Sequence, residues 1–156
     1  MSYQLAWREC FGGHLALGHK PGQKLRDELE RTACTLIVSL LSESESRSPA
    51  SEHRLRLPLS GAAPPPPSRD GEVLAAFAQI HRELAAGGKV YLHCSAGLHR
   101  TGMVAYAFLR CAGLDRDEAV RRIRELRELT ATELTEERMA WGDRLAHEHV
   151  TDPIAD

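Results

Sequence analysis

Several features that would assign the chain to a special class of protein are missing from its sequence. No apolar run approaches the ~20 residues that a membrane-spanning helix needs, so no membrane span is predicted. Residues 1–10 have polar and charged side chains throughout and lack the apolar centre of a secretory signal. No C-x-x-C pair occurs among the four cysteines, so structural zinc is not expected. These absences favour a reducing, cytoplasmic setting.

Charge of one sign is not in excess either. The chain has 20 Lys and Arg against 22 Asp and Glu, a net charge of −2 at pH 7. This balance does not indicate nucleic-acid binding, although it is compatible with a basic pocket at one site. A length of 156 residues suits one domain, which we place at residues 1–150, with a frayed tail at 151–156. No pattern indicates the oligomeric state.

Hydrophobic periodicity divides the chain into strands that alternate with helices. The predicted strands are Tyr3–Trp7, His14–Leu17, Thr35–Leu41, His53–Leu57 and Lys89–His93. Helical spacing is found over Leu25–Thr32, Val73–Leu84, Thr101–Cys111, Ala119–Leu126 and Thr130–His149. This order predicts an α/β fold with a central, mostly parallel sheet of about five strands flanked by helices.

A stiff segment separates the fourth predicted strand from the next helix. Residues 58–69 include four consecutive prolines at 64–67, which exclude a helix or a central strand. We predict a loop, with a proline-rich ligand for a partner domain as the alternative. Ser68 or Asp70 is expected to cap the helix that follows, and Asp115 a later one, where Glu118 would complete a capping box.

One stretch carries chemistry, H-C-S-A-G-L-H-R-T-G at residues 93–102. A bare C-x5-R pattern is expected about 0.4 times by chance in this composition, whereas the full pattern lowers that to roughly 10⁻⁴. The stretch follows a predicted buried strand and opens a predicted helix, so backbone N–H groups can turn inward and form an anion cradle. We therefore predict a phosphate loop from His93 to Thr101. Its phosphate-binding residues are expected to be Ser95, Ala96, Gly97, Leu98, His99 and Arg100.

The side chains of this phosphate loop have distinct predicted roles. The cradle and the helix end favour a thiolate, so the pKa of Cys94 should be depressed and Cys94 is the expected nucleophile. Gly97 allows backbone angles that other residues resist. Arg100 offers a planar fork that matches two phosphate oxygens. The Thr101 hydroxyl can donate to the sulfur and help it leave, and His93 is expected to orient the loop through backbone hydrogen bonds.

At this motif the sequence resembles the protein tyrosine phosphatase superfamily, and its size and layout are most similar to the small dual-specificity phosphatases. The segment H-R-L-R-L-P at residues 53–58 and the residues after the loop, Glu118-Ala119-Val120, Ile123-Arg124 and Arg127, follow that family's order. The resemblance implies two-step hydrolysis of a phosphate monoester through a phosphocysteine, without a metal or cofactor. The substrate would be a phosphorylated protein or small molecule.

The sequence departs from this family at the general acid. The family carries an aspartate just after the strand that ends in proline, where this chain has Leu59 and Ser60. Asp70, at the far end of the same loop, and His99, inside the cradle, are the candidate replacements. The alternative for Asp70 is a helix cap, and the alternative for His99 is an outward-facing ring.

The last predicted helix departs from the family as well. Glu137 falls near the position where the small phosphatases often place a glutamine that orients the hydrolytic water. Arg138 beside it is either a substrate contact or a solvent-facing charge.

An active phosphomonoesterase is the leading hypothesis for function. Its substrate could be a phosphotyrosine, a phosphoserine or phosphothreonine, a lipid or inositol phosphate, or a nucleotide or RNA phosphate. A catalytically weak phosphate-binding pseudophosphatase module is the alternative, because the loop acid is missing. Sulfur transfer by a rhodanese-like domain is a third hypothesis, which the Arg100-Thr101 pair fits less well.

Overall fold

The computed structural model of the chain describes residues 5–46 and 51–149, so the predicted tail at 151–156 lies outside the described residues. Five strands form one sheet in the order β1-β2-β5-β3-β4. The strands are β1 (Arg8–Cys10), β2 (Gly13–Gly18), β3 (Leu36–Ser39), β4 (Arg54–Arg56) and β5 (Lys89–His93). All neighbours pair in parallel except β1, which runs antiparallel to β2. The predicted α/β fold with a mostly parallel sheet is confirmed, as is the edge position of β4.

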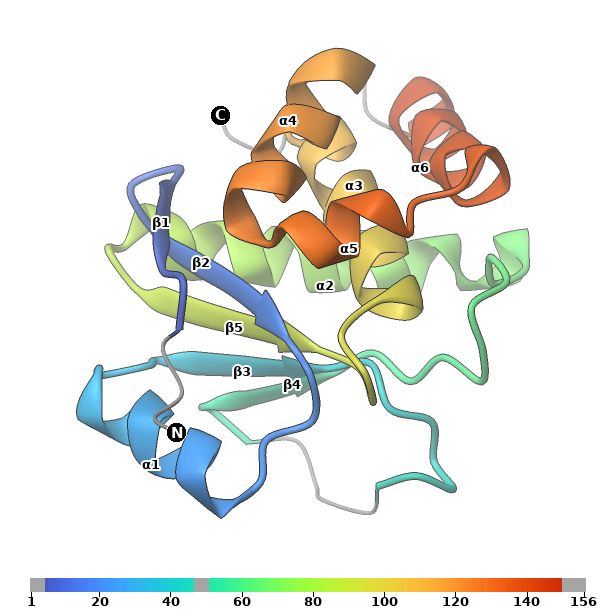
Figure 1. Cartoon of the computed structure of the whole chain (residues 1–156). Helices are drawn as coiled ribbons and strands as arrows, with labels where there is room; N and C mark the ends of the chain where they lie inside the picture. Colours follow the sequence, from blue (N-terminus) through green and yellow to red (C-terminus); the bar gives the residue numbers. More distant parts are fainter. Residues whose placement is uncertain (1–4, 47–50, 150–156) are drawn as a thin grey trace.

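Helices flank both faces of this sheet. They are α1 (Gln23–Arg31), α2 (Asp70–Ala85), α3 (His99–Cys111), α4 (Arg116–Leu126), α5 (Glu128–Thr132) and α6 (Glu136–His149), and a 3-10 turn, η1 (Pro67–Arg69), precedes α2. Figure 1 shows α1 on one side of the sheet and the later helices on the other. Within the described ranges, none of these helices has the length and apolar character needed to cross a membrane.

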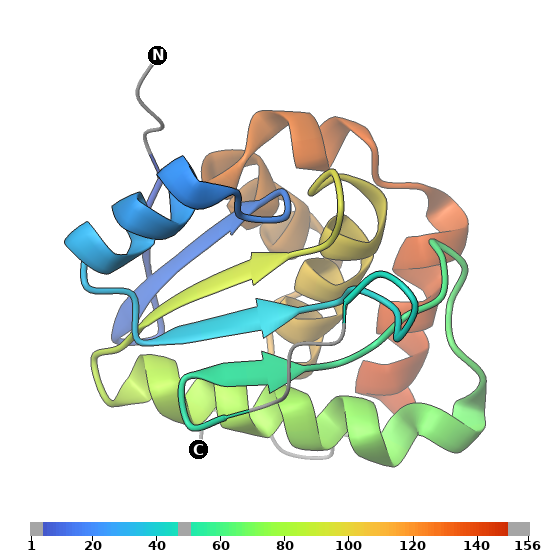
Figure 2. The same ribbon diagram turned by 90° about the horizontal axis from the view of Figure 1, so that it is seen from below.

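Alternating side chains divide the sheet between two cores. In β3, Leu36 and Val38 are buried in the main core with α2 and α3, whereas Ile37 packs with Leu25 and Leu29 of α1. The smaller helix layer is incomplete. Figure 2 shows α1 toward the β2 side of this face, with no helix in front of β3 and β4.

Helix α3 is the central helix of the larger layer, as its apolar sequence predicted. Every residue from Thr101 to Leu109 is buried. It packs against α6 on one side and follows directly from the loop after β5. A loop anchored between a buried strand and a buried helix is held at both ends, which suits a site that needs fixed geometry.

The first predicted strand is displaced in the structure. We expected Tyr3–Trp7, but Tyr3 lies outside the described residues and the strand is β1, which ends at the turn itself. Its register pairs Cys10 with Gly13. The tight turn at Phe11 and Gly12, both with positive φ (49° and 97°), sets that register, so pairing begins closer to the turn than the apolar pattern suggested. Trp7 instead donates to the Thr32 hydroxyl at 3.2 Å.

The last predicted helix, Thr130–His149, is two helices. Helix α5 ends at Thr132, and the buried hydroxyl of Thr130 within it bonds to the phosphate loop described below. Helix α6 starts afresh after Thr135, whose hydroxyl accepts from the Arg138 N–H at 3.3 Å. Threonines favour such end contacts over helix interiors, which explains the break.

The predicted helix caps were half right. Asp115 caps α4, and its carboxylate accepts from the Glu118 N–H at 2.8 Å. At α2 the residue before the helix is Arg69, which makes no side-chain capping bond, so neither Ser68 nor Asp70 caps that helix. The proline-rich segment forms a loop as predicted, except for the turn η1, and Arg69 fastens it by donating to the Pro58 carbonyl at 2.6 Å.

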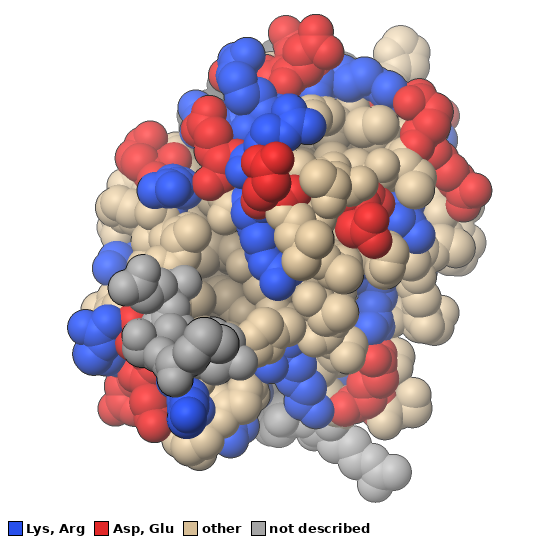
Figure 3. All heavy atoms as spheres, viewed as in Figure 1, with Lys and Arg blue, Asp and Glu red and all other residues tan. Residues whose placement is uncertain are grey.

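Basic and acidic side chains are interspersed over the described surface seen in Figure 3. This mixture agrees with the near-neutral net charge.

Candidate active site

The phosphate loop crosses from the end of β5 at His93 to the start of α3 at His99. Figure 1 shows it at the edge of the sheet where the parallel strands end. Ligands bind at this edge in open α/β sheets. A cavity of about 450 Å³ opens there. The residues that line it are Ser42, Ser44, Glu45, Ser60, Gly61, Ala62, Cys94, Ser95, Ala96, His99 and Arg100.

Gly97 gives the loop its shape. Its φ of +76° is a conformation that residues with a Cβ rarely adopt, and a Cβ at this position would lie 2.4 Å from the Gly18 carbonyl. Two residues from beyond α4 hold the Gly97 carbonyl, because Arg127 Nη1 and the Thr130 hydroxyl each donate to it at 2.7 Å. With the carbonyl engaged in these contacts, the Gly97 N–H donates to the Cys94 sulfur.

Cys94 is buried and receives several hydrogen bonds at its sulfur. The Thr101 hydroxyl donates at 3.1 Å, as predicted, and the Thr101 and Gly97 N–H groups donate as well. Burial alone would raise the pKa of Cys94, but these bonds and the charge of Arg100 outweigh it and lower the pKa. Burial without such donors raises the pKa of Cys10 to about 11 and that of Cys111 to about 12. Cys94 is therefore chemically distinct from the other buried thiols.

Arg100 is fixed at the mouth of the loop by a carboxylate that the sequence did not reveal. Its Nη1 and Nη2 donate to Glu45 Oε1 and Oε2 at 2.6 and 3.0 Å, and Nη1 also donates to the Leu59 carbonyl at 2.9 Å. The Ser42 N–H donates to the same carboxylate at 2.9 Å. The bond from Arg100 is the main reason why the pKa of Glu45 falls to about 2. Glu45 is therefore ionised throughout the neutral range and positions the guanidinium.

His93 supports the loop from beneath, in the way the sequence suggested. Its Nδ1 lies 3.1 Å from the Cys94 carbonyl, and its ring stacks on Tyr91 with centroids 5.7 Å apart. Burial is the main cause that lowers the pKa of His93 to about 4. The ring is therefore neutral near pH 7, and a protonated Nδ1 can donate to the carbonyl.

His99 lines the cavity, but its ring is engaged by Arg138. Arg138 Nη1 lies 3.2 Å from His99 Nδ1, and Arg138 Nε donates to the Ala62 carbonyl at 3.1 Å. A guanidinium can only donate, so Nδ1 accepts and the ring proton is on Nε2. Arg138 thus ties α6 to the loop at Ala62, whereas Glu137 is exposed and does not line the cavity.

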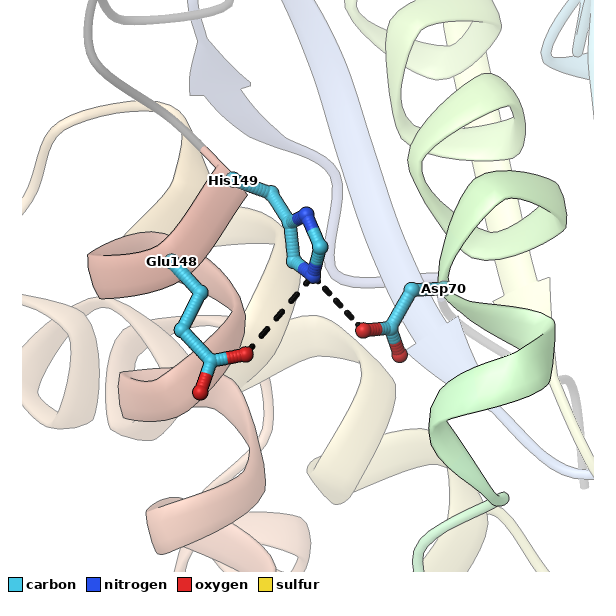
Figure 4. A group of neighbouring side chains, drawn as sticks. All are labelled: Asp70, Glu148 and His149. Carbon is cyan, nitrogen blue, oxygen red and sulfur yellow. Dashed lines mark hydrogen bonds and ion pairs between the residues drawn. The ribbon is translucent and has the colours of Figure 1, made fainter.

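Asp70 is not at this cavity. Figure 4 shows its carboxylate pointing toward His149 of α6, with His149 Nε2 2.7 Å from Asp70 Oδ2. Arg144 donates to both carboxylate oxygens, at 2.9 and 3.0 Å. The hydrogen bonds from Arg144 are the main cause that lowers the pKa of Asp70. The contact with His149 lowers it further, whereas burial alone would raise it. The structure therefore keeps Asp70 at the α2–α6 contact, away from the cavity that residues 60–62 of the same loop line together with Cys94.

The same cluster contains three side chains of the kind that bind metals. Ligand atoms of Asp70, Glu148 and His149 lie within 4.8 Å of one another. The Asp70 carboxylate is already neutralised by Arg144, which also bonds Glu148 at 2.9 Å. A second cation would meet that positive charge, so we describe the group as an ion-pair cluster between α2 and α6.

Sequence reasoning missed three residues of the site: Glu45, Arg127 and Thr130. Glu45 lies in a serine-rich loop without periodicity, so no local signal marks it. Arg127 stands in the stretch that resembles the family, but nothing in the sequence showed that it reaches a carbonyl 30 residues away. Thr130 was placed at the start of the last predicted helix, and nothing in the sequence showed that its hydroxyl reaches Gly97.

Comparison with known proteins agrees with this geometry. The sequence model described as the tyrosine phosphatase family matches residues 26–149. The solved structure of Tk-PTP in its active form is 25% identical, with a TM-score of 0.71 over 90% of this chain and 96% of that one. No curated protein matches the chain significantly.

Two further structures share the fold. Kinase associated phosphatase, with serine in place of its catalytic cysteine, has a TM-score of 0.76 at 17% identity and covers 96% of this chain and 98% of its own. Human DUSP28 has a TM-score of 0.67 at 20% identity and covers 90% of this chain and 95% of its own. Since the family model spans most of the sequence and a cysteine and an arginine meet in its phosphate loop, the chain belongs to the tyrosine phosphatase family and is a phosphatase.

Proposed function

We propose that this protein is a cysteine-dependent phosphomonoesterase that works without a metal ion through a phosphocysteine intermediate. The observation that carries the proposal is the set of donors around Cys94: the Thr101 hydroxyl at 3.1 Å and two backbone N–H groups. Together with Arg100 they stabilise a thiolate, which is the nucleophilic form.

The two steps follow from these residues. The Cys94 thiolate attacks phosphorus and forms a P–S bond as the P–O bond to the leaving group breaks. The leaving oxygen takes a proton, and the Arg100 guanidinium balances charge on the phosphoryl oxygens. Water then attacks phosphorus, the P–S bond breaks, and the Thr101 hydroxyl stabilises the departing thiolate. Inorganic phosphate is released.

Hydrolysis of para-nitrophenyl phosphate in the presence of a chelator tests this proposal. We expect turnover that the chelator does not change, because every group assigned to the reaction belongs to the chain. Rapid quenching during turnover should give a mass increase of one phosphoryl group on the peptide that contains Cys94. Turnover that required an added metal ion, or a phosphoryl group on another residue, would contradict the proposal.

Protonation of the leaving group is the weakest part of this site. Among the described residues that line the cavity, Glu45 is the one with a carboxyl group. Its pKa of about 2 leaves it ionised, so it has no proton to give. We propose His99 as the acid, because its ring lines the cavity together with Cys94 and could approach the leaving group once the contact to Arg138 is released. General acid help is typically worth 10²–10⁴ in rate, so the loss of this acid should be felt far more by a substrate with a poor leaving group.

We expect para-nitrophenyl phosphate to be hydrolysed at least about 100-fold faster than glycerol phosphate, whose alkoxide needs a proton. His99→Ala should lower turnover of glycerol phosphate by at least about 100-fold and have a much smaller effect on the aryl substrate. An equal loss on both substrates, or no loss on glycerol phosphate, would remove His99 from this role.

Asp70→Asn is the matched variant for the second sequence candidate. It should leave the turnover of both substrates unchanged and lower Tm at pH 7 by about 5 °C, since it weakens an ion pair worth about 2 kcal/mol. The folded pKa of Asp70 is depressed, so the pair stabilises the protein above the unfolded pKa and is lost as pH falls through the folded value. The Tm difference should therefore shrink below about pH 4. A loss of alkyl phosphate turnover without a loss of stability would restore Asp70 as the acid.

A phosphate-binding module of low activity is the second candidate, favoured by the missing carboxylic acid. It would keep the Arg100 fork and the phosphate loop and bind phosphorylated partners. Phosphate binding without turnover of any aryl phosphate would select it.

The cytoplasmic setting is part of the proposal. All four cysteines are free thiols in the structure, in keeping with a reducing environment.

A further inference from the structure

A second cavity, of about 80 Å³, lies on the face of the sheet that α1 leaves uncovered. Four basic side chains line it, from Lys20, Arg26, Arg54 and Arg56, and within the described part of the chain no acidic side chain does. We call it the basic cavity.

The strand pattern brings the two arginines of β4 to this cavity. Arg54 pairs with Ile37 and Arg56 with Ser39, so both point to the same face as these β3 residues, whereas Leu55 packs against the main core. Edge strands often carry exposed charges that only prevent aggregation. Here the two guanidinium groups instead converge with Lys20 from the β2–α1 loop.

The basic side chains of the cavity differ in the partners that they have. Arg56 donates to the Ser46 carbonyl at 3.0 Å and lies 3.6 Å from the exposed Glu43. For Arg54 and Lys20 the structure records no acidic partner among the described residues. Their charges act on His93. Burial is the main cause that lowers the pKa of His93, and the charges of Arg54 and Lys20 lower it further. Cations held together this way attract an anion.

The basic cavity adjoins the active site. At three places one residue lines the basic cavity and its sequence neighbour lines the active-site cavity: His93 and Cys94, Leu41 and Ser42, Ser46 and Glu45. The Lys20 N–H also donates to the carbonyl of Ser95 in the phosphate loop at 2.9 Å. The two cavities are therefore separated by little more than the chain at the ends of β3 and β5.

We propose that the basic cavity binds a second phosphate group of the substrate, so that the preferred substrate is a small molecule with two phosphomonoester groups. One group lies in the phosphate loop, and the other is held by Arg54, Arg56 and Lys20. Guanidinium forks match phosphate oxygens, and a phosphomonoester carries nearly two negative charges near pH 7. This inference names the substrate class of the proposed phosphatase and rests on that proposed function.

Calorimetric binding to the native protein tests the inference without needing turnover. The probes are α,ω-alkanediphosphonates of increasing chain length and the matching monophosphonates, which resist hydrolysis. At one chain length the diphosphonate should bind at least about tenfold more tightly than its monophosphonate, because the second group binds from a high effective concentration. Arg54→Gln should abolish this preference and leave the monophosphonate affinity and the turnover of para-nitrophenyl phosphate unchanged.

Arg82→Gln is the matched control, because it removes an exposed arginine from α2 on the other side of the sheet and should keep the preference. No preference at any chain length, or a preference that Arg54→Gln retains, would overturn the inference. A third result would also overturn it: two monophosphonate molecules bound to each native chain but only one bound to each Arg54→Gln chain. That result would assign the basic cavity to a separate phosphate anion. If the preference and its loss are found but no aryl phosphate is hydrolysed, the proposed catalysis fails and the second phosphate site stands.

Discussion

Cys94→Ser is expected to reduce hydrolysis of para-nitrophenyl phosphate to the detection limit, a loss on the order of 10⁵ in kcat. The serine hydroxyl would occupy the same cradle, but donors that suffice to ionise a thiol do not ionise an alcohol. The change should leave the fold intact, because serine is close to cysteine in size and can accept the bond from Thr101. Steady-state kinetics from pH 5 to pH 8 would measure the loss.

Cys34→Ser is the control for this substitution. Its thiol is half-buried and donates to the carbonyls of Leu36 and Lys89 at 3.5 Å, contacts that a hydroxyl can keep. This variant should retain native turnover.

Alkylation by iodoacetate adds a second measurement. Since the pKa of Cys94 is lowered, the alkylation rate of Cys94 should level off at a lower pH than the alkylation rate of an ordinary thiol. Residual turnover of Cys94→Ser within a factor of ten of native would place the nucleophile elsewhere.

Arg100→Lys should lower kcat/KM for the same substrate roughly 10³-fold. A lysine keeps the charge but has no planar fork, so it cannot bind two phosphoryl oxygens and at the same time meet both oxygens of Glu45. The loss should appear in both kcat and KM, because the guanidinium contacts the phosphate in the ground state and more strongly in the transition state.

The exposed Arg82 of α2 again provides a control, since Arg82→Lys makes the same chemical change away from the site. Circular dichroism of both variants would separate a folding defect from a catalytic one. If Arg100→Lys kept activity within about tenfold of native, a point charge would be sufficient and the fork would lose its assigned role.

The phosphate loop could be predicted because its determinants are local. The nucleophile, the glycine with positive φ and the arginine lie within seven consecutive residues between a strand and a helix, and the helical and strand periodicities around them are strong. The order of elements also fixed the mostly parallel sheet, since strands that alternate with helices leave few other topologies.

The supporting contacts could not be predicted because they join distant parts of the chain. Glu45 and Arg100 are 55 residues apart, and Asp70 and Arg144 are 74 apart. Asp70 had the right residue type and loop for a general acid, but its placement depends on a partner in α6 that has no sequence signature. The bond from the Thr130 hydroxyl to the Gly97 carbonyl is of the same kind, since these residues are 33 apart.

The close approach of Gly97 to Gly18 decides where a working fragment of this protein can begin. Gly18 ends β2, which pairs with β5 along its whole length and leads into the segment where Lys20 bonds Ser95. A fragment trimmed to start at α1 would lose an edge of the sheet together with one wall of the phosphate loop. Fusion junctions, tags and domain exchanges should therefore be placed before β1, even though the motif that defines the chemistry lies some 85 residues later.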